Sequence, residues 1–187
     1  MTEIQTSDPD GRAIPYVDEG EGPVTLALIS ARSLEADGLG VISHYLAEEA
    51  GFRVVRVGAR PGADTAQERA DDALAVIDDL GIADSWIGGH GAGGTAARVF
   101  AADHTDRVNG LLLLGVEDEQ IALAPLIPVL IIQGTADEVT PAGHAERLQA
   151  TAPERASIKT LEGADHLFPV THPIDAAVII EEYLDWD

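Results

Sequence analysis

The chain has 187 residues, and none of them is cysteine. Disulfide bonds, thiolate metal ligands and cysteine nucleophiles are therefore excluded. Basic residues are scarce too, because only 11 of them, with Lys159 as the single lysine, stand against 33 acidic residues. The resulting net charge of −22 repels polyanions, so neither nucleic acid nor a membrane surface is expected as a partner. Such an acidic excess is typical of a solvated surface.

Histidines spaced for zinc are also missing. The six histidines form no H-x-x-x-H or H-E-x-x-H motif, so no metal site is expected, and no cofactor is indicated. No apolar run is long enough to span a membrane, and the polar, acidic first residues lack the regions of a signal peptide. These observations predict a soluble, cytoplasmic protein.

Hydrophobic residues make up 45% of the chain and gather in short runs rich in Val, Ile and Leu. Such runs are typical of strands buried on both faces of a parallel sheet; they occupy residues 24–30, 52–58, 84–89, 108–115, 128–134 and 156–163. Alanine-rich stretches of helical spacing alternate with them, at 39–50, 65–80, 92–103, 141–151 and 173–184. The alternation predicts one α/β domain over residues 1–187, with a mostly parallel sheet and helices on both faces. Residues 14–23 are expected to form an edge strand and a turn, and Trp186 to anchor the last helix.

A glycine-rich stretch, GGHGAGG at 88–94, joins an apolar run to a helical pattern. Two kinds of site use such a junction. One is the G-x-S-x-G elbow of hydrolases, in which a serine stands on a sharp strand-to-helix turn. The other is the dinucleotide loop G-x-G-x-x-G, which Gly89, Gly91 and Gly94 satisfy, with Glu117 near the distance of its acidic partner.

Two polar residues follow neighbouring predicted strands. Asp137 comes just after the strand at 128–134, and His166 comes just after the strand at 156–163. Ligands bind beyond the carboxyl ends of strands in open α/β sheets. A carboxylate there can accept the Nδ1–H of an imidazole, fix its tautomer and leave Nε2 as a base. The chain order, glycine-rich turn, then Asp, then His, favours the hydrolase elbow over the dinucleotide loop.

Four separated segments, at 10–23, 88–115, 134–148 and 161–173, resemble the α/β-hydrolase family in order and spacing. The resemblance covers almost the whole chain and implies that family's fold. It also implies that Asp137 is the acid, that His166 is the base, and that Gly91 occupies the position of the nucleophile.

The chain departs from the family pattern at that position. Gly91 has no side chain, so no covalent acyl-enzyme can form there, and neither Thr95 nor Ser85 is placed to replace it. The family's His-Gly turn, which supplies oxyanion donors, is replaced by Ile-Ser-Ala-Arg-Ser at 29–33. The resemblance retains only the N–H of Ala92 and the positive end of the helix that follows.

A third departure is the short connection at 116–127, which leaves no room for a cap domain. The site is therefore expected to be open, or covered by another copy in a homo-oligomer. The residues expected to contact a small-molecule ligand or substrate are Ser30, Ala31, Arg32, His90 and Ala92. Arg32 is open to two interpretations, recognition of an anion or a surface salt bridge.

Several functions remain open at this stage. The chain is either a general-base enzyme, using His166 and Asp137 on a small activated carbonyl or ester, or a non-catalytic pseudohydrolase or binding module. In its elbow glycine it resembles the N-myc downstream-regulated proteins, which are regarded as lacking hydrolase activity. A further alternative is an ordinary serine esterase in which serine has been replaced at position 91. The last is a dinucleotide-binding protein.

Overall fold

The computed structural model describes residues 3–185, so Trp186 lies outside the described part. Eight strands form one sheet in the order β1-β2-β4-β3-β5-β6-β7-β8. They are β1 (Gln5–Ser7), β2 (Ile14–Glu19), β3 (Thr25–Ile29), β4 (Arg53–Val57), β5 (Ser85–His90), β6 (Val108–Leu114), β7 (Val129–Gly134) and β8 (Ala156–Leu161). Strands β3 to β8 pair in parallel, whereas β1 and β2 are antiparallel additions at one edge.

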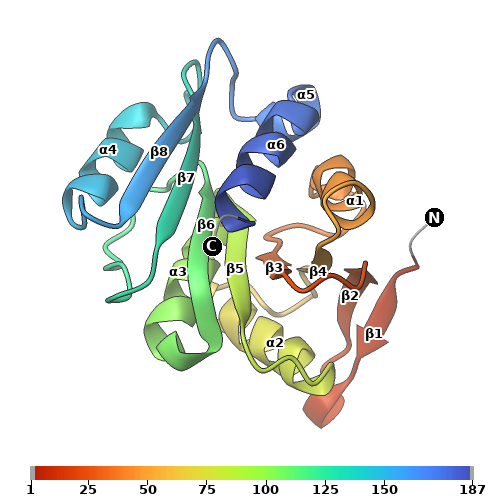
Figure 1. Cartoon of the computed structure of the whole chain (residues 1–187). Coiled ribbons are helices and arrows are strands. Elements are labelled where there is room, and N and C mark those ends of the chain that lie inside the picture. The colour runs from red at the N-terminus through yellow and green to blue at the C-terminus, as the bar shows by residue number, and fades with distance from the viewer. Residues whose placement is uncertain (1–2, 186–187) are drawn as a thin grey trace.

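Helices cover both faces of the sheet (Figure 1). Helices α1 (Gly40–Glu48), α5 (Phe168–Thr171) and α6 (Pro173–Leu184) pack on one face. Helices α2 (Ala66–Asp79), α3 (Ala92–Asp103) and α4 (Ala142–Ala150) pack on the other. Two short 3₁₀ helices, at Pro9–Gly11 and Thr105–Arg107, lie in the connections.

The two cores follow from the alternation of side chains along each strand. Leu26 and Leu28 of β3 face the core under α1 and α6, while Ala27 and Ile29 face the core under α2 and α3. Successive side chains of a strand point to opposite faces, so a strand buried on both sides must be apolar at every position. This is why the apolar runs of the sequence are continuous rather than alternating.

The predicted fold class is confirmed. Every predicted strand and helix is present, with ends that differ by a few residues at most. The strand predicted at 14–23 is β2, but it is not at the edge of the sheet, because it pairs antiparallel with both β4 and β1 and β1 forms the edge. Four elements were not predicted from the sequence: the three-residue β1, the four-residue α5 and the two 3₁₀ helices. They are too short to leave a periodic pattern.

The connection between β6 and β7 contains no helix or strand at residues 115–128, and no cap domain is inserted there. Arg98 of α3 holds this connection in place. Its buried guanidinium donates to the carbonyl oxygens of Glu117 (3.4 Å), Glu119 (3.2 Å) and Ile121. No helix within residues 3–185 is long and apolar enough to cross a membrane.

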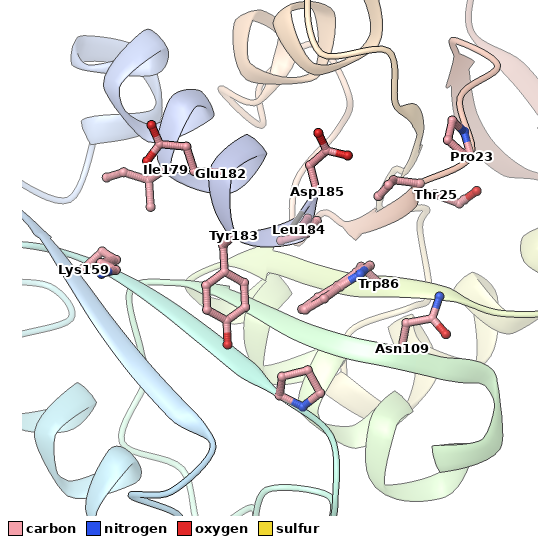
Figure 2. Close-up of a pocket in the computed structure, with 12 residues that line it drawn as sticks. Pro23, Thr25, Trp86, Asn109, Lys159, Ile179, Glu182, Tyr183, Leu184 and Asp185 are labelled. Atoms are coloured by element: carbon pink, nitrogen blue, oxygen red, sulfur yellow. The ribbon is translucent and has the colours of Figure 1, made fainter. Parts of the chain in front are cut away.

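A cavity of about 1040 Å³ opens near the first residues of β3, β5, β6 and β7. Figure 2 shows Trp86 and Tyr183 in its wall, with ring centroids 5.8 Å apart in an edge-to-face arrangement. The ring of Trp86 covers Gly110, where a Cβ would lie 2.2 Å from it. None of the candidate site residues lines this cavity. It lies at the end of the sheet opposite to the carboxyl ends of the strands, where the candidate site is found.

Candidate active site

The site residues meet because their strands are neighbours in the sheet. Ser30 follows β3, Gly91 follows β5, Asp137 follows β7 and His166 follows β8. Strands β3 to β8 are parallel, so their carboxyl ends all lie at the same end of the sheet. These candidate residues thus lie at the carboxyl ends of the strands, where ligands bind in this class of fold.

Gly91 forms the whole turn between β5 and α3. Its backbone angles are φ 55° and ψ −117°, a conformation that side-chain-bearing residues rarely adopt. A Cβ added there would meet only the imidazole of His166, at 3.4 Å from Cε1 and 3.5 Å from Nε2. The position where a nucleophile would stand is thus open space that faces the imidazole.

His166 is held by Asp137 and Thr140. Its Nδ1 lies 3.0 Å from Oδ2 of Asp137 and 3.1 Å from Oγ1 of Thr140. The Thr140 hydroxyl donates to the same carboxylate oxygen at 2.6 Å, and the other oxygen, Oδ1, accepts the N–H groups of Val139 and Thr140. Because a carboxylate only accepts, Nδ1 carries a proton and Nε2 is left to act as a base.

The Asp137 carboxylate is fully buried. Burial by itself would raise its pKa, but the hydrogen bonds from Thr140 and the contact with His166 outweigh burial and leave the pKa below its ordinary value. Asp137 is therefore ionised at neutral pH and can stabilise a positive charge on the imidazole of His166.

His90 packs beneath the base. Its ring stacks on that of His166, with centroids 4.3 Å apart, and its Nε2 lies 2.8 Å from the carbonyl oxygen of His166. A carbonyl can only accept, so His90 carries its proton on Nε2. Burial, then the charge of His166, lowers the pKa of His90 to about 4. His90 is thus neutral at pH 7 and supports the loop of His166.

The loop after β3 is built around a buried ion pair. Arg56 of β4 donates to both oxygens of Asp37 at 3.0 Å. Asp37 also accepts the hydroxyl of Ser30 at 2.7 Å and the N–H of Leu39 at 2.9 Å. The Ser30 hydroxyl therefore helps to hold the loop. This network was not anticipated from the sequence, because its members come from one irregular loop and a neighbouring strand.

Ala92 and Ala31 line the same cavity as Gly91, and each carries a backbone N–H. Ala92 begins α3, and the first N–H groups of a helix have no partner within it. Ala31 follows Ser30, and its N–H has no backbone acceptor within residues 3–185. Gly93 brings the two segments together: a Cβ there would lie 2.0 Å from the Ile29 oxygen and 3.6 Å from the Ala31 nitrogen. The loop thus offers an N–H beside α3 even though the His-Gly turn is absent.

These groups line one cavity of about 250 Å³, here called the site cavity. Its residues include the five expected ligand contacts, Ser30, Ala31, Arg32, His90 and Ala92, together with Gly91, Asp37, Glu117, Thr140 and His166. Three exposed apolar side chains, Val139, Leu167 and Val170, also line it. An apolar rim of this kind suits an organic ligand.

The glycines of the dinucleotide pattern have a packing explanation. A Cβ at Gly89 would lie 2.3 Å from the carbonyl carbon of Gly93, and one at Gly94 would lie 3.0 Å from the Gly89 oxygen. Glu117, the expected acidic partner of such a loop, instead accepts the hydroxyl of Thr95 at 2.6 Å. Both glycines are needed for the close approach of α3 to β5. Among residues 3–185, no group of three His, Asp or Glu side chains is arranged to hold a metal ion.

A model of the Alpha/beta hydrolase family matches residues 27–168. No curated protein matches the sequence significantly.

Solved structures match over nearly the whole chain. A predicted CIB-like hydrolase from Thermoplasma acidophilum is 15% identical, with a TM-score of 0.81 and 98% of each chain covered. A thermophilic esterase from Thermogutta terrifontis, with malate bound, is 19% identical, with a TM-score of 0.80; the match covers 99% of this chain and 98% of that one. An epoxide hydrolase from Vigna radiata is 14% identical, with a TM-score of 0.79 and 98% of each chain covered. At these identities the likeness concerns the fold.

Proposed function

Because the chain belongs to the alpha/beta hydrolase family, we propose that it hydrolyses a small activated ester without a covalent intermediate. His166, oriented by Asp137, is the general base, and water replaces the missing nucleophile. The observation that carries the proposal is the open position at Gly91. A Cβ placed there would lie 3.5 Å from Nε2 of His166.

The proposed reaction begins with a water molecule above Gly91. Nε2 of His166 takes a proton from this water as its oxygen attacks the carbonyl carbon of the ester. The negative charge that develops on the carbonyl oxygen is stabilised by the N–H groups of Ala92 and Ala31. The ionised Asp137 stabilises the imidazolium, which then returns the proton to the leaving alcohol.

The expected rate limits the class of substrate. General-base catalysis contributes about 10²–10⁴-fold, and one oxyanion donor about 10²–10³-fold in other enzymes. An enzyme with these two contributions and no nucleophile needs a good leaving group. The apolar rim of Val139, Leu167 and Val170 suits the carbon chain of such an ester, and a second copy of the chain is an alternative cover for the same rim.

The test measures hydrolysis of 4-nitrophenyl acetate by the wild type and by two variants. His166→Ala should remove the general-base contribution of about 10²–10⁴-fold, and Asp137→Asn should remove most of it through loss of the tautomer and orientation. His172→Ala is the matched control, because His172 does not line the site cavity. The rate that this variant loses measures hydrolysis by an imidazole outside the site. The wild type should show no burst and no labelling by a fluorophosphonate.

Equal rates for the wild type and His166→Ala would contradict the proposal and favour a non-catalytic pseudohydrolase. Stoichiometric labelling of a serine or threonine would instead reveal a relocated nucleophile. Gly91→Ser gives a further comparison: position 91 has space for a Cβ, but its backbone (φ 55°) is strained for any residue with a side chain. If the fluorophosphonate labels position 91 of this variant and leaves the wild type unlabelled, the site has lost only its nucleophile.

A further inference from the structure

The walls of the site cavity also indicate the charge of the substrate. We propose that the substrate carries a carboxylate on the side of the β3 loop, and that Arg32 binds it. This inference rests on the proposed function and names the substrate class of the same site.

Arg32 lines the site cavity as a cation without an acidic partner. Its side chain forms no ion pair with any of residues 3–185, although the chain has 33 acidic residues. The acids of the same cavity already have partners. Asp37 is paired with Arg56, and Glu117 accepts the hydroxyl of Thr95. Arg32 is thus the charged group of the cavity that remains free to bind a ligand.

The backbone of Arg32 is fixed even though its side chain is exposed. Its carbonyl oxygen accepts the N–H of Ala59 at 3.0 Å, and the N–H of Ser30 donates to the Val57 oxygen at 2.9 Å. The buried pair of Arg56 and Asp37 holds the rest of the loop. A guanidinium presents a planar fork of donors that matches a carboxylate, so a fixed backbone with a free side chain suits a ligand that arrives from solvent.

The order of the strands indicates on which side of Gly91 the substrate carboxylate lies. Strand β5 lies between β3 and β6, so Gly91 is flanked by the loop of Arg32 on one side and by Glu117 on the other. A carboxylate on the β3 side meets a cation, whereas one on the β6 side meets another carboxylate. The charge of Arg32 also reaches the base loop, because it is one of the causes that lower the pKa of His90, after burial and His166.

The experiment compares two esters that differ by one charge, 4-nitrophenyl hydrogen adipate and its neutral methyl ester. The wild type should prefer the acid ester in kcat/KM. Arg32→Met should lower the ratio of the two kcat/KM values by about two- to fivefold, the effect of one exposed charge-assisted pair, and Arg32→Lys should restore part of it.

Arg147→Met is the matched control. It changes the net charge by the same amount, but Arg147 is an exposed residue of α4 that pairs with Asp118 and does not line the site cavity. Its ratio should equal that of the wild type. A ratio that Arg32→Met leaves unchanged, or that Arg147→Met lowers equally, would overturn the proposal.

Failure of the proposed function has a different signature, because the wild type would then hydrolyse neither ester faster than His166→Ala does. The proposal about Arg32 is in that case tested by binding of monomethyl adipate, followed by NMR titration, with dimethyl adipate as the neutral comparison. Binding of the anion that weakens about two- to fivefold in Arg32→Met supports it. Absent binding, or equal binding to the variant, overturns it.

Discussion

At the scale of single residues, the site is organised by hydrogen bonds that fix which atom carries a proton. His166 is held through Nδ1, and His90 is held through Nε2, so the two stacked rings have opposite tautomers. The Nε2 atom of His166 faces the open position at Gly91, 3.5 Å from where a Cβ would stand. Two neighbouring histidines therefore have different tasks, the first as the proposed base and the second as the support of its loop.

His90 should make the fold sensitive to moderate acid. Its folded pKa, about 4, lies below the ordinary value of 6.5, so the unfolded chain binds the proton first as the pH falls. Stability is therefore lost progressively between about pH 6.5 and pH 4. For His90 alone this loss amounts to about 2 kcal/mol between pH 7 and pH 5. The pKa of Asp137 is lowered in the folded state. Its contribution to stability is therefore lost only when the pH falls through and below the ordinary pKa of a carboxyl group.

The measurement is the free energy of urea unfolding at pH 7 and pH 5 for the wild type and His90→Gln. The glutamine amide can still donate to the carbonyl oxygen of His166 but does not titrate. The variant should lose about 2 kcal/mol less than the wild type over this interval. An identical loss in both proteins would show that His90 is protonated as easily in the folded state as in the unfolded state.

The sequence predicted which residues meet at the site but not how they are held. Asp137 and His166 were found because each follows a recognisable strand, and strand ends of a parallel sheet share one edge. The roles of Thr140 and Asp37 were not predicted. Thr140 acts through a loop conformation that brings its hydroxyl back to Asp137, and Asp37 acts through a pairing with Arg56 across 19 residues. Neither contact has a periodic signature in the sequence.

At the scale of elements, glycine sets how closely α3 can approach β3 and β5. The Ile29 oxygen lies 2.0 Å from where a Cβ of Gly93 would be, so any side chain there would separate α3 from β3. The same approach brings Ala31 beside the first turn of α3. The long apolar runs made the strands predictable, whereas the polar, three-residue β1 became a strand only through its pairing with β2.

Gly93→Ala should therefore destabilise the protein by about 2–3 kcal/mol, the cost of overpacking against backbone that cannot yield. Gly143→Ala is the comparison within another helix, α4, where the Cβ would meet only the flexible end of Arg147 at 3.3 Å. It should be neutral or stabilise by about 0.5 kcal/mol, since alanine favours the helix. Both are measured by urea unfolding. Equal effects of the two changes would mean that α3 can shift away from β3 without loss.

At the scale of the whole molecule, charge opposes compactness. With 33 acidic and 11 basic residues, even complete pairing would leave 22 carboxylates without a cation. Within residues 3–185, seven arginines form ion pairs. Most of these pairs lie partly exposed, where each contributes about 0–1 kcal/mol. The surface is therefore governed by repulsion between like charges, and the folded chain concentrates that repulsion in a smaller volume than the unfolded chain does.

Added salt should accordingly stabilise the fold. The Debye length falls from about 30 Å at 0.01 M to about 3 Å at 1 M, so carboxylates that repel one another in dilute buffer become independent, while the buried pair of Arg56 and Asp37 is screened much less. A gain of about 2 kcal/mol would raise Tm by about 4–8 °C in a chain of this size.

The measurement is thermal unfolding at pH 7.5 in NaCl between 0.01 M and 1 M. It is repeated in KCl, because screening depends on ionic strength rather than on the identity of the cation. A Tm that falls with salt would mean that the exposed ion pairs stabilise the fold by more than the excess of carboxylates destabilises it. A rise in NaCl but not in KCl would point to bound sodium ions instead of screening.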